Sequence, residues 1–243
     1  MTVISVERLT KRFGSVTVVD DLSFTVAPGE IVGFLGPNGA GKTTTLAMLL
    51  GLLLPTSGRV HVLGGEMPAE RQRILARVNF TSPYVSLPGN LTVDENLRVF
   101  AHLYGVREAG VRIERLLERF GIAHMRRRPA ARLSSGEGTR LGLVKALLND
   151  PEVLFLDEPT ASLDPDNAEH VRESLREIRA ERRMTLFYTS HNMQEVERLS
   201  DRILFLHEGR LIADGPPAEV LRRFARDTLE EMFLDVARSG RAT

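Results

Sequence analysis

The chain has 243 residues, of which 42% are hydrophobic and 26% are charged, and its 32 basic residues balance its 32 acidic ones. This composition is typical of a globular protein and excludes a disordered or fibrous chain, while the neutral charge gives no bulk attraction for nucleic acid. Because there is no cysteine, a disulfide framework, a thiol nucleophile and a cysteine-ligated metal are excluded as well. The longest apolar run, 46–54, is about half the length that spans a bilayer, so no membrane-crossing segment is predicted.

The N-terminal part of the sequence contains closely spaced strand candidates. Turn signals such as Phe13-Gly14 and Pro28-Gly29 separate them, so neighbouring strands are expected to pair locally. A glycine-rich loop then opens a helix that is expected to run to about Leu53, before Pro55 and Gly58. The predicted strands are 3–6, 16–19, 22–26 and 30–35.

From about Ser82 to Asp150 the strand signal disappears and a helical pattern replaces it. Thr92 and Glu95 have the spacing of a capping box for a helix through Tyr104, and another helix is predicted over 111–120. Strands and helices then alternate again, which is typical of an α/β fold with a mostly parallel sheet. The later predicted elements are strands 153–156, 185–188 and 202–206, a helix over 167–180 and a helix after residue 191.

Residues 36–43, GPNGAGKT, match the phosphate-binding loop pattern between a strand and a helix. The glycines let consecutive backbone N–H groups surround phosphate oxygens, and the helix N-terminus adds positive potential. Lys42 is expected to reach the β- and γ-phosphates, and Thr43 to place its hydroxyl on Mg²⁺. The alternative is a glycine-rich turn without a ligand. The predicted nucleotide-binding residues of this loop are Gly36, Pro37, Asn38, Gly39, Ala40, Gly41, Lys42, Thr43 and Thr44.

An acidic pair follows the apolar strand candidate 153–156. A nucleotide site needs an acidic residue at the end of a buried strand to hold the metal, and Asp157 fills that position. Glu158 is then available to polarise an attacking water. Such a pair alone also fits a helix cap or a solvated carboxylate. Together with the phosphate loop, it predicts a nucleotide hydrolase.

Residues 133–137, LSSGE, resemble the signature motif of the ATP-binding subunits of ABC transporters, usually LSGGQ. Ser134 and Gly136 are kept, whereas Ser135 replaces a glycine and Glu137 replaces a glutamine. The resemblance implies that this motif contacts the γ-phosphate of an ATP bound by an opposing subunit, with a helix N-terminus directed at it. The alternative is an N-cap for the helix that follows.

Further segments resemble the same family in the same order. Residues 161–164, ASLD, resemble the D-loop, in which Asp164 would link two active sites across a dimer. His191 lies in a segment that resembles the switch region, whose histidine hydrogen-bonds the γ-phosphate and helps order the water. Phe13 aligns with the aromatic residue that stacks on adenine. The alternatives are a structural histidine and a hydrophobic residue in a turn.

One residue of the family pattern is missing. The family has a glutamine at the junction into the helical insertion, where it contacts Mg²⁺, and this sequence has Ser82 or Pro83 there. A serine hydroxyl can ligate or water-bridge the metal, whereas proline cannot. Ser82 is therefore predicted as a metal ligand with Thr43 and Asp157.

The insertion is rich in arginine. Eight arginines and three glutamates lie between Arg112 and Arg140, and the run 126–128 is expected to be a solvated face. The excess of positive charge leaves open a surface that faces lipid headgroups or a partner. By contrast, the only lysines in the sequence are Lys11, Lys42 and Lys145, a bias that is interpreted as genome composition.

The resemblance covers residues 3–235 and implies an ABC ATPase cassette. It would consist of a P-loop NTPase core with an N-terminal antiparallel β-subdomain over 1–81 and 151–225, a helical subdomain over 82–150, and a C-terminal helix and tail over 226–243. The segment 228–234 resembles the closing helix of the exporter branch, whose members pair with separate membrane subunits.

The implied function is ATP hydrolysis with Mg²⁺ that powers export. Two copies would stack head to tail on integral-membrane permease subunits at the cytoplasmic face of the cell membrane, and no nucleic-acid partner is expected. Glu158, His191 and Lys42 are the predicted catalytic residues. Two alternatives stay open: an ABC-type ATPase that drives a membrane complex without transport, and a soluble ABC-type ATPase that acts on nucleic acid.

Overall fold

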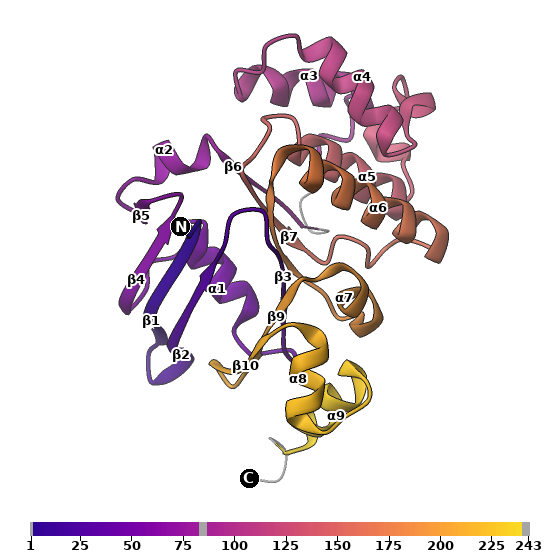
Figure 1. The fold of residues 1–243 in the computed structure, drawn as a ribbon. Coiled ribbons are helices and arrows are strands. Elements are labelled where there is room, and N and C mark those ends of the chain that lie inside the picture. Colours follow the sequence, from indigo (N-terminus) through magenta and orange to yellow (C-terminus); the bar gives the residue numbers. More distant parts are fainter. Residues whose placement is uncertain (1, 83–86, 240–243) are drawn as a thin grey trace. The chain divides into compact units, whose positions relative to one another are not determined.

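Two compact units make up the computed structural model, which describes residues 2–82 and 87–239 (Figure 1). The first unit contains Met1–Leu75 and Thr185–Thr243, and the second contains Ala76–Met184. The chain therefore leaves the first unit, builds the second and returns. The subdomain boundaries expected after residues 81 and 150 stay a prediction. In the described part of the chain, no helix is both long and apolar enough to cross a membrane.

An antiparallel sheet forms the N-terminal part of the first unit, and the pairing of its first two strands along the chain confirms the expected local pairing for the first three strand candidates. For the fourth candidate, 30–35, that prediction is wrong, because this strand pairs with strands far along the chain. The segments 16–19 and 22–26 are one continuous strand rather than two, because Asp21 takes a left-handed conformation (φ 50°) and the register shifts without breaking the pairing. The helix α1 (Lys42–Leu49) contacts this sheet. In spatial order the strands are β2 (Val16–Val26), β1 (Ile4–Phe13), β4 (Ser57–Val62) and β5 (Gly65–Met67).

A mainly parallel sheet forms the rest of the first unit. Its central strand β3 (Ile31–Leu35) pairs in parallel with β8 (Thr185–Thr189) and with β9 (Arg202–His207), and β10 (Arg210–Gly215) adds an antiparallel edge. Every residue of β3 and β8 is buried, as expected for strands covered on both faces. The remaining elements of this unit are α2 (Arg71–Leu75), α7 (Met193–Leu199), α8 (Pro217–Phe224) and α9 (Leu229–Ser239).

Three phenylalanines join the two sheets of the first unit. The ring centroid of Phe187 lies 5.2 Å from that of Phe34 and 5.9 Å from that of Phe24. These rings come from β8, β3 and β2, and all three are buried. Packed aromatic rings of this kind contribute about 0.5–1.5 kcal/mol per pair beyond the area that they bury. The cluster therefore fixes the antiparallel sheet to the strand that precedes the phosphate loop.

The helix α1 ends at Leu49, so the prediction that it runs to about Leu53 is wrong. Gly51 takes a left-handed conformation (φ 63°), and the N–H groups of Leu52 and Leu53 both donate to the Ala47 carbonyl, at 2.8 and 3.1 Å. A glycine in this conformation is a common C-cap, and the hydrogen bonds that follow it satisfy a carbonyl of the last helical turn. The helix therefore ends before Gly51, inside the apolar run 46–54, and not at Pro55 or Gly58.

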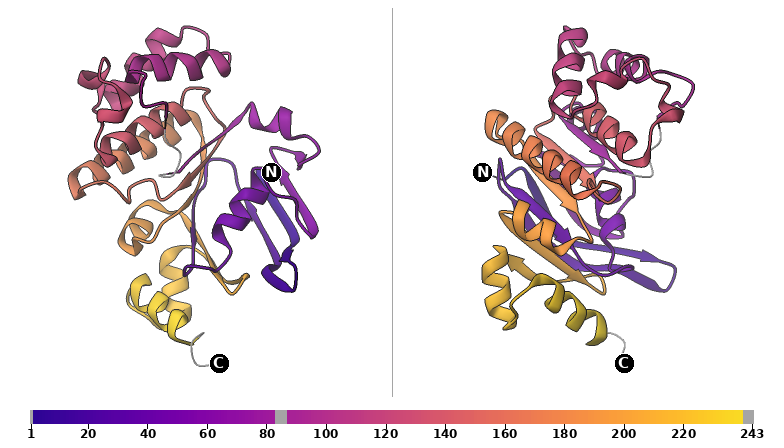
Figure 2. Two further views of the ribbon diagram at one scale, coloured as in Figure 1. Left: turned by 180° about the vertical axis from the view of Figure 1, so that it is seen from behind. Right: turned by 90° about the vertical axis from the view of Figure 1, so that its right-hand side faces the viewer.

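The second unit is built on a parallel strand pair and a group of helices (Figure 2). The helices α3, α4 and α5 pack against one another, and α5 also contacts β6. The predicted capping box is confirmed: Thr92 Oγ1 accepts the Glu95 N–H at 3.2 Å, and the Thr92 N–H donates to Glu95 Oε2 at 2.7 Å. The elements are β6 (Val78–Thr81), α3 (Val93–Leu103), α4 (Ala109–Arg119), α5 (Ser135–Ala146), β7 (Val153–Asp157) and α6 (Pro165–Arg182).

A backbone pairing connects the start of α3 with the chain that leads into α5. The Ala130 N–H donates to the Leu91 carbonyl at 2.9 Å and the Ala131 N–H to the Gly89 carbonyl at 3.0 Å. On the other side, the Val93 N–H donates to the Arg128 carbonyl at 3.0 Å. The approach to α5 is therefore held by hydrogen bonds and not only by side-chain packing.

Candidate nucleotide-binding site

The phosphate loop lies between β3 and α1, as the sequence predicts. The Ala40 N–H donates to the Pro37 carbonyl at 3.1 Å, and the buried Lys42 ammonium donates to the carbonyls of Gly36 and Pro37 at 2.6 and 3.1 Å. The ammonium thus lies against the loop at the start of a helix, where backbone N–H groups and the helix dipole favour anions. Of the other predicted loop residues, Thr44 is half-buried, and Asn38, Gly39 and Thr43 are exposed.

Two glycines of the loop leave no room for a side chain unless the neighbouring backbone moves. At Gly36 (φ 150°) a Cβ would lie 2.2 Å from the Leu206 carbonyl oxygen, and at Gly41 (φ 102°) it would lie 2.7 Å from the Val18 carbonyl oxygen. The Gly209 N–H also donates to the Ala40 carbonyl at 3.1 Å. The loop therefore packs closely against the end of β9 and against β2. This packing holds its backbone in place in the absence of a ligand.

The predicted switch histidine lies in the turn between β8 and α7. His191 is exposed, but its neighbours are anchored: the Ser190 hydroxyl donates to Glu195 Oε2 at 3.0 Å and accepts the Asn192 N–H at 3.1 Å. Asn192 in turn caps α7 by accepting the Glu195 N–H at 3.1 Å. These bonds hold the histidine in a fixed turn. Ser190 and Glu195 belong to the segment that resembles the switch region, but their contact is not predicted from the sequence, because it exists only in the folded turn.

Phe13 ends β1, and its side chain is 49% exposed. The Lys11 ammonium lies 5.0 Å from the centroid of the Phe13 ring. A half-exposed phenyl ring at the end of a strand is available for stacking with a flat ligand. This position agrees with the predicted adenine contact, which stays a prediction.

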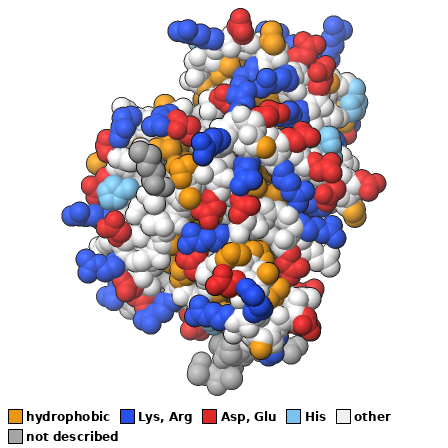
Figure 3. Space-filling model, in the orientation of Figure 1, with side chains coloured by type: hydrophobic (Ala, Val, Ile, Leu, Met, Phe, Trp, Pro, Cys, Tyr) orange, Lys and Arg blue, Asp and Glu red, His pale blue; other side chains and the backbone are white. Residues whose placement is uncertain are grey.

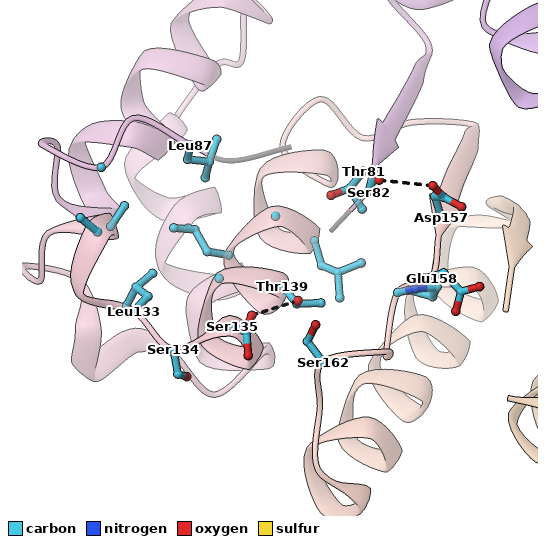
Figure 4. A pocket seen from close by; sticks show the side chains of 18 residues that line it. Thr81, Ser82, Leu87, Leu133, Ser134, Ser135, Thr139, Asp157, Glu158 and Ser162 are labelled. Carbon is cyan, nitrogen blue, oxygen red and sulfur yellow. Dashed lines mark hydrogen bonds between the residues drawn. The ribbon is translucent and has the colours of Figure 1, made fainter. Parts of the chain in front are cut away.

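Five of the predicted site residues of the second unit line a pocket of about 480 Å³ (Figure 4): Ser82, Ser134, Ser135, Asp157 and Glu158. It is lined by the end of β6, the first turns of α5, the turn after β7 and the loop before α6. Figure 4 shows Ser134, Ser135 and Thr139 at the start of α5 on one side of the pocket, and Ser82 and Asp157 on the other. Hydroxyl and carboxylate oxygens are the polar groups at its rim.

Within this pocket, the Ser82 hydroxyl donates to Asp157 Oδ2 at 3.3 Å. Asp157 ends β7 and is half-buried, and the next residue, Glu158, takes a left-handed conformation (φ 52°). A non-glycine residue in this conformation stores about 1 kcal/mol of strain, which the surrounding structure must offset. The two carboxylates therefore leave the strand on a sharp turn. Pro83, the other candidate for the missing glutamine, lies outside the described residues.

The signature segment begins α5 with a capping box. Ser134 Oγ accepts the Glu137 N–H at 3.3 Å, and the Ser134 N–H donates to Glu137 Oε2 at 2.7 Å. This hydrogen bond from the Ser134 backbone, together with the charges of Arg128 and Arg140, lowers the pKa of Glu137. Arg128 also forms an ion pair with Glu137 at 3.4 Å. The N-cap interpretation of this segment is therefore confirmed, and contact with a nucleotide stays a prediction.

Close packing explains why residue 136 is a glycine, and the sequence alone does not predict that packing. A Cβ at this position would lie 3.0 Å from the Ser162 carbonyl oxygen and 3.2 Å from Leu163 Cδ2. The loop that contains Ser162 ends at Asp164, which caps α6 by accepting the Asn167 N–H at 3.0 Å. Hydrogen bonds from the Asn167 side chain and backbone lower the pKa of Asp164. The signature helix and the predicted D-loop are thus in direct contact.

The prediction of a solvated face holds for Arg127 and Arg128, which are exposed, and is wrong for Arg126, which is half-buried. Arg126 Nε lies 2.8 Å from Asp94 Oδ1, and Arg128 pairs with Glu137. Figure 3 shows acidic side chains interspersed with basic ones on the face that it draws. Of the other arginines, Arg112 donates to the Leu147 carbonyl, Arg119 binds Glu181 and Arg140 donates to the Phe120 carbonyl.

All three lysines donate to main-chain carbonyls. Besides Lys42, the Lys11 ammonium donates to the Leu54 carbonyl at 2.8 Å and the Lys145 ammonium to the Phe80 carbonyl at 3.2 Å. Lys42 and Lys145 are buried, and Lys11 is half-buried. Their scarcity among the basic residues is the one signal in the sequence that points to Lys11 and Lys145.

Comparisons with known proteins agree with this geometry. The chain is 42% identical over 221 residues to the Nod factor export ATP-binding protein I of Ralstonia nicotianae, covering 90% of this chain and 68% of that protein. It is 40% identical over 237 residues to the bacitracin transport ATP-binding protein BcrA of Bacillus licheniformis, covering 96% of this chain and 76% of that protein.

A solved structure described as the ATP binding subunit of an ABC transporter is similar over 97% of this chain and 100% of that one. The TM-score is 0.86 and the sequence identity 29%. The family model for ABC transporters matches residues 19–161, which is more than half of the chain. The α/β fold with a phosphate loop, the relatives and the family match agree, and the chain belongs to the ATP-binding proteins of the ABC transporter family, which are ATPases coupled to transport.

Proposed function

We propose that this chain binds ATP with Mg²⁺ and hydrolyses it to power export through a separate integral-membrane permease. The observation that carries the ATP-binding part is the phosphate loop, in which Lys42 lies against the carbonyls of Gly36 and Pro37 at the N-terminus of α1. A glycine-rich loop at a helix N-terminus, with a buried ammonium beside it, fits a polyphosphate. The two relatives named for Nod factor export and bacitracin transport support the transport part.

The residues present fit a magnesium ion carried by the nucleotide. Ser82 and Asp157 place a hydroxyl and a carboxylate oxygen 3.3 Å apart, and Thr43 is exposed beside the phosphate loop. Mg²⁺ prefers oxygen ligands and is commonly held by one or two carboxylates together with substrate phosphates. Bound there, it would neutralise charge on the β- and γ-phosphates as the terminal phosphate is transferred.

In the proposed mechanism each side chain has one task. Lys42 and the loop N–H groups bind the phosphates, and Phe13 stacks on adenine. Glu158 accepts the proton of the attacking water, and His191 hydrogen-bonds the γ-phosphate. Ser134, Ser135, Gly136 and Glu137 of a second copy complete the site, and Asp164 links the two sites. The γ-phosphate then holds the dimer together and its hydrolysis releases it.

The test is Glu158→Gln, which keeps the size of the side chain and removes its basicity. Turnover should fall by at least about 100-fold, because general base catalysis commonly contributes 10²–10⁴-fold. ATP should still bind, and an ATP-bound dimer should accumulate. Phosphate release, titration calorimetry with ATP and light scattering after size exclusion measure the three quantities.

Glu114→Gln on α4 is the matched control, since this glutamate is exposed and lies on a different helix from the predicted site. It should hydrolyse ATP at the native rate. Native turnover in the Glu158→Gln variant would show that Glu158 is not the general base. Loss of ATP binding in that variant, with the fold intact, would contradict the assigned division between binding and hydrolysis.

A further inference from the structure

The Phe13 ring has a cation on one of its faces. Lys11 and Phe13 lie at the end of β1, where the register against β2 shifts between Lys11 and Arg12. The ammonium lies 5.0 Å from the ring centroid, within the roughly 6 Å over which a cation and an aromatic face attract each other. Half of the phenyl side chain remains exposed.

The ammonium is held in this place by a second contact. It donates to the Leu54 carbonyl at 2.8 Å, in the segment that follows α1. That segment is anchored to β1 without the lysine, because the Thr56 N–H donates to the Thr10 carbonyl at 2.8 Å and Thr56 Oγ1 accepts the Arg12 N–H at 2.9 Å. Lys11 is therefore not needed to hold the segment. The segment instead fixes the position of the ammonium.

A cation on one face of a phenyl ring changes how the ring stacks. The face of an aromatic ring carries partial negative charge, so two stacked rings repel through their π-systems unless they are offset. A cation behind one ring draws that charge toward itself, which reduces the repulsion felt by a purine on the opposite face. It also restricts the ring to one orientation, so less conformational entropy is lost on binding.

We propose that Lys11 is a positioning residue for the nucleobase. It orients and polarises the Phe13 ring from behind, and the exposed part of the ring receives adenine. The inference rests on the proposed function, in which Phe13 is the stacking residue. It adds a role for a side chain that contacts neither phosphate nor metal in the proposed mechanism.

The experiment compares two ligands that differ in the base. Binding of ATP and of inorganic tripolyphosphate, each with Mg²⁺, is measured by titration calorimetry for the native chain and for Lys11→Met. The variant should bind ATP roughly two- to fivefold more weakly, the range expected of an exposed cation–π contact. Tripolyphosphate affinity should not change, because it has no base to stack.

A double-mutant cycle with Phe13→Leu isolates the coupling. Phe13→Leu alone should weaken ATP binding about tenfold, and adding Lys11→Met to it should cost nothing further. Lys11→Arg should retain native affinity, because arginine also pairs with aromatic rings. Arg12→Met, which removes a neighbouring exposed cation, should bind both ligands as the native chain does.

Each unfavourable result has a distinct meaning. Equal losses for ATP and tripolyphosphate in Lys11→Met would overturn the proposal, because the lysine would then act on the phosphates. Additive losses in the double variant, or loss of affinity in Lys11→Arg, would overturn it too. If Phe13→Leu binds ATP normally, the stacking role in the proposed function is wrong, whereas the phosphate loop is tested separately by loss of binding in Lys42→Ala.

Discussion

Lys145 is a cation in a place that proteins usually fill with apolar side chains. It lies on α5, is 8% exposed, and contacts the Phe80 carbonyl at 3.2 Å and the Phe100 ring at 5.5 Å from its centroid. Among the described residues, no carboxylate forms an ion pair with it. Desolvation by burial lowers its pKa, because the charged form loses water without gaining an anion.

Lys145→Met is therefore expected to raise the free energy of unfolding, by about 1 kcal/mol at neutral pH, because it replaces a buried charge with an apolar side chain. The effect should depend on pH with a defined sign. A lowered pKa in the folded state means that the unfolded chain binds the proton more tightly, so the native protein gains stability as pH rises toward the ordinary lysine pKa of about 10.4.

The stability difference between Lys145→Met and the native chain should thus shrink between about pH 7 and about pH 10. Urea unfolding at several pH values measures it, and Arg127→Met, which removes an exposed cation of the same unit, is the control without such a trend. A difference that stays constant with pH, or a less stable variant throughout, would contradict the interpretation of Lys145 as a desolvated cation.

At the level of elements, α5 begins in contact with the loop before α6. Its capping box satisfies backbone N–H groups that a helix start would otherwise leave unpaired, a contribution of about 1 kcal/mol. Gly136 allows the Ser162 carbonyl to approach this first turn, whereas a Cβ at Gly138 would meet nothing within 4 Å. Close packing therefore requires a glycine at position 136 but not at position 138, although both lie in the first turn of the helix.

These two glycines allow a matched comparison. Gly138→Ala should raise the free energy of unfolding by about 0.5–1 kcal/mol, because alanine loses less backbone entropy in a helix. Gly136→Ala should not raise the free energy of unfolding in this way, because the Ser162 carbonyl would have to move away from the new Cβ. Hydrogen exchange of the Leu163 amide, which donates to the Thr160 carbonyl at 3.0 Å, should be faster only in Gly136→Ala. Equal stabilisation by both substitutions would show that the loop adjusts without cost.

Over the whole molecule, the features that the sequence predicts well are those fixed by neighbouring residues. The capping box at Thr92 and the phosphate loop are complete within a few positions, so their spacing is enough. The short elements β4, β5, α2, β6, β10 and α8 are not predicted. Each of them spans only three to eight residues, too few for a clear pattern, and two of the strands depend on partners far along the chain: β4 pairs with β1 and β6 with β7.

The same distinction between local and distant contacts applies to the candidate site. Its chemical residues follow from motifs, but their surroundings do not. The environment of Lys145 is set by Phe80, 65 residues away, and that of Gly136 by Ser162. The ion pairs of Arg126 and Arg128 likewise need Asp94 and Glu137 to be brought near by the fold. Tertiary contacts, which leave no local pattern, account for what sequence reasoning misses.

The last prediction concerns the complex of this chain with a membrane partner. A tagged chain purified from detergent-solubilised membranes of its source cells should recover a polytopic membrane protein, since the proposed function places substrate contacts in a separate permease. Mass spectrometry identifies the recovered chain, and a mock purification without the tag is the control. Recovery of soluble proteins or nucleic acid alone would contradict the transporter assignment and favour a soluble ATPase.

The three lysines, each bound to a main-chain carbonyl, also define the chemical reactivity of the protein. Acylating reagents attack neutral, accessible amines, and Lys42 and Lys145 are buried. Lys11 is the half-buried one, and it lies beside the Phe13 ring. Apart from the chain terminus, amine-directed labels and cross-linkers therefore act on a single side chain. The same scarcity that distinguishes this sequence makes lysine acylation a site-selective probe of the surface where a nucleobase would lie.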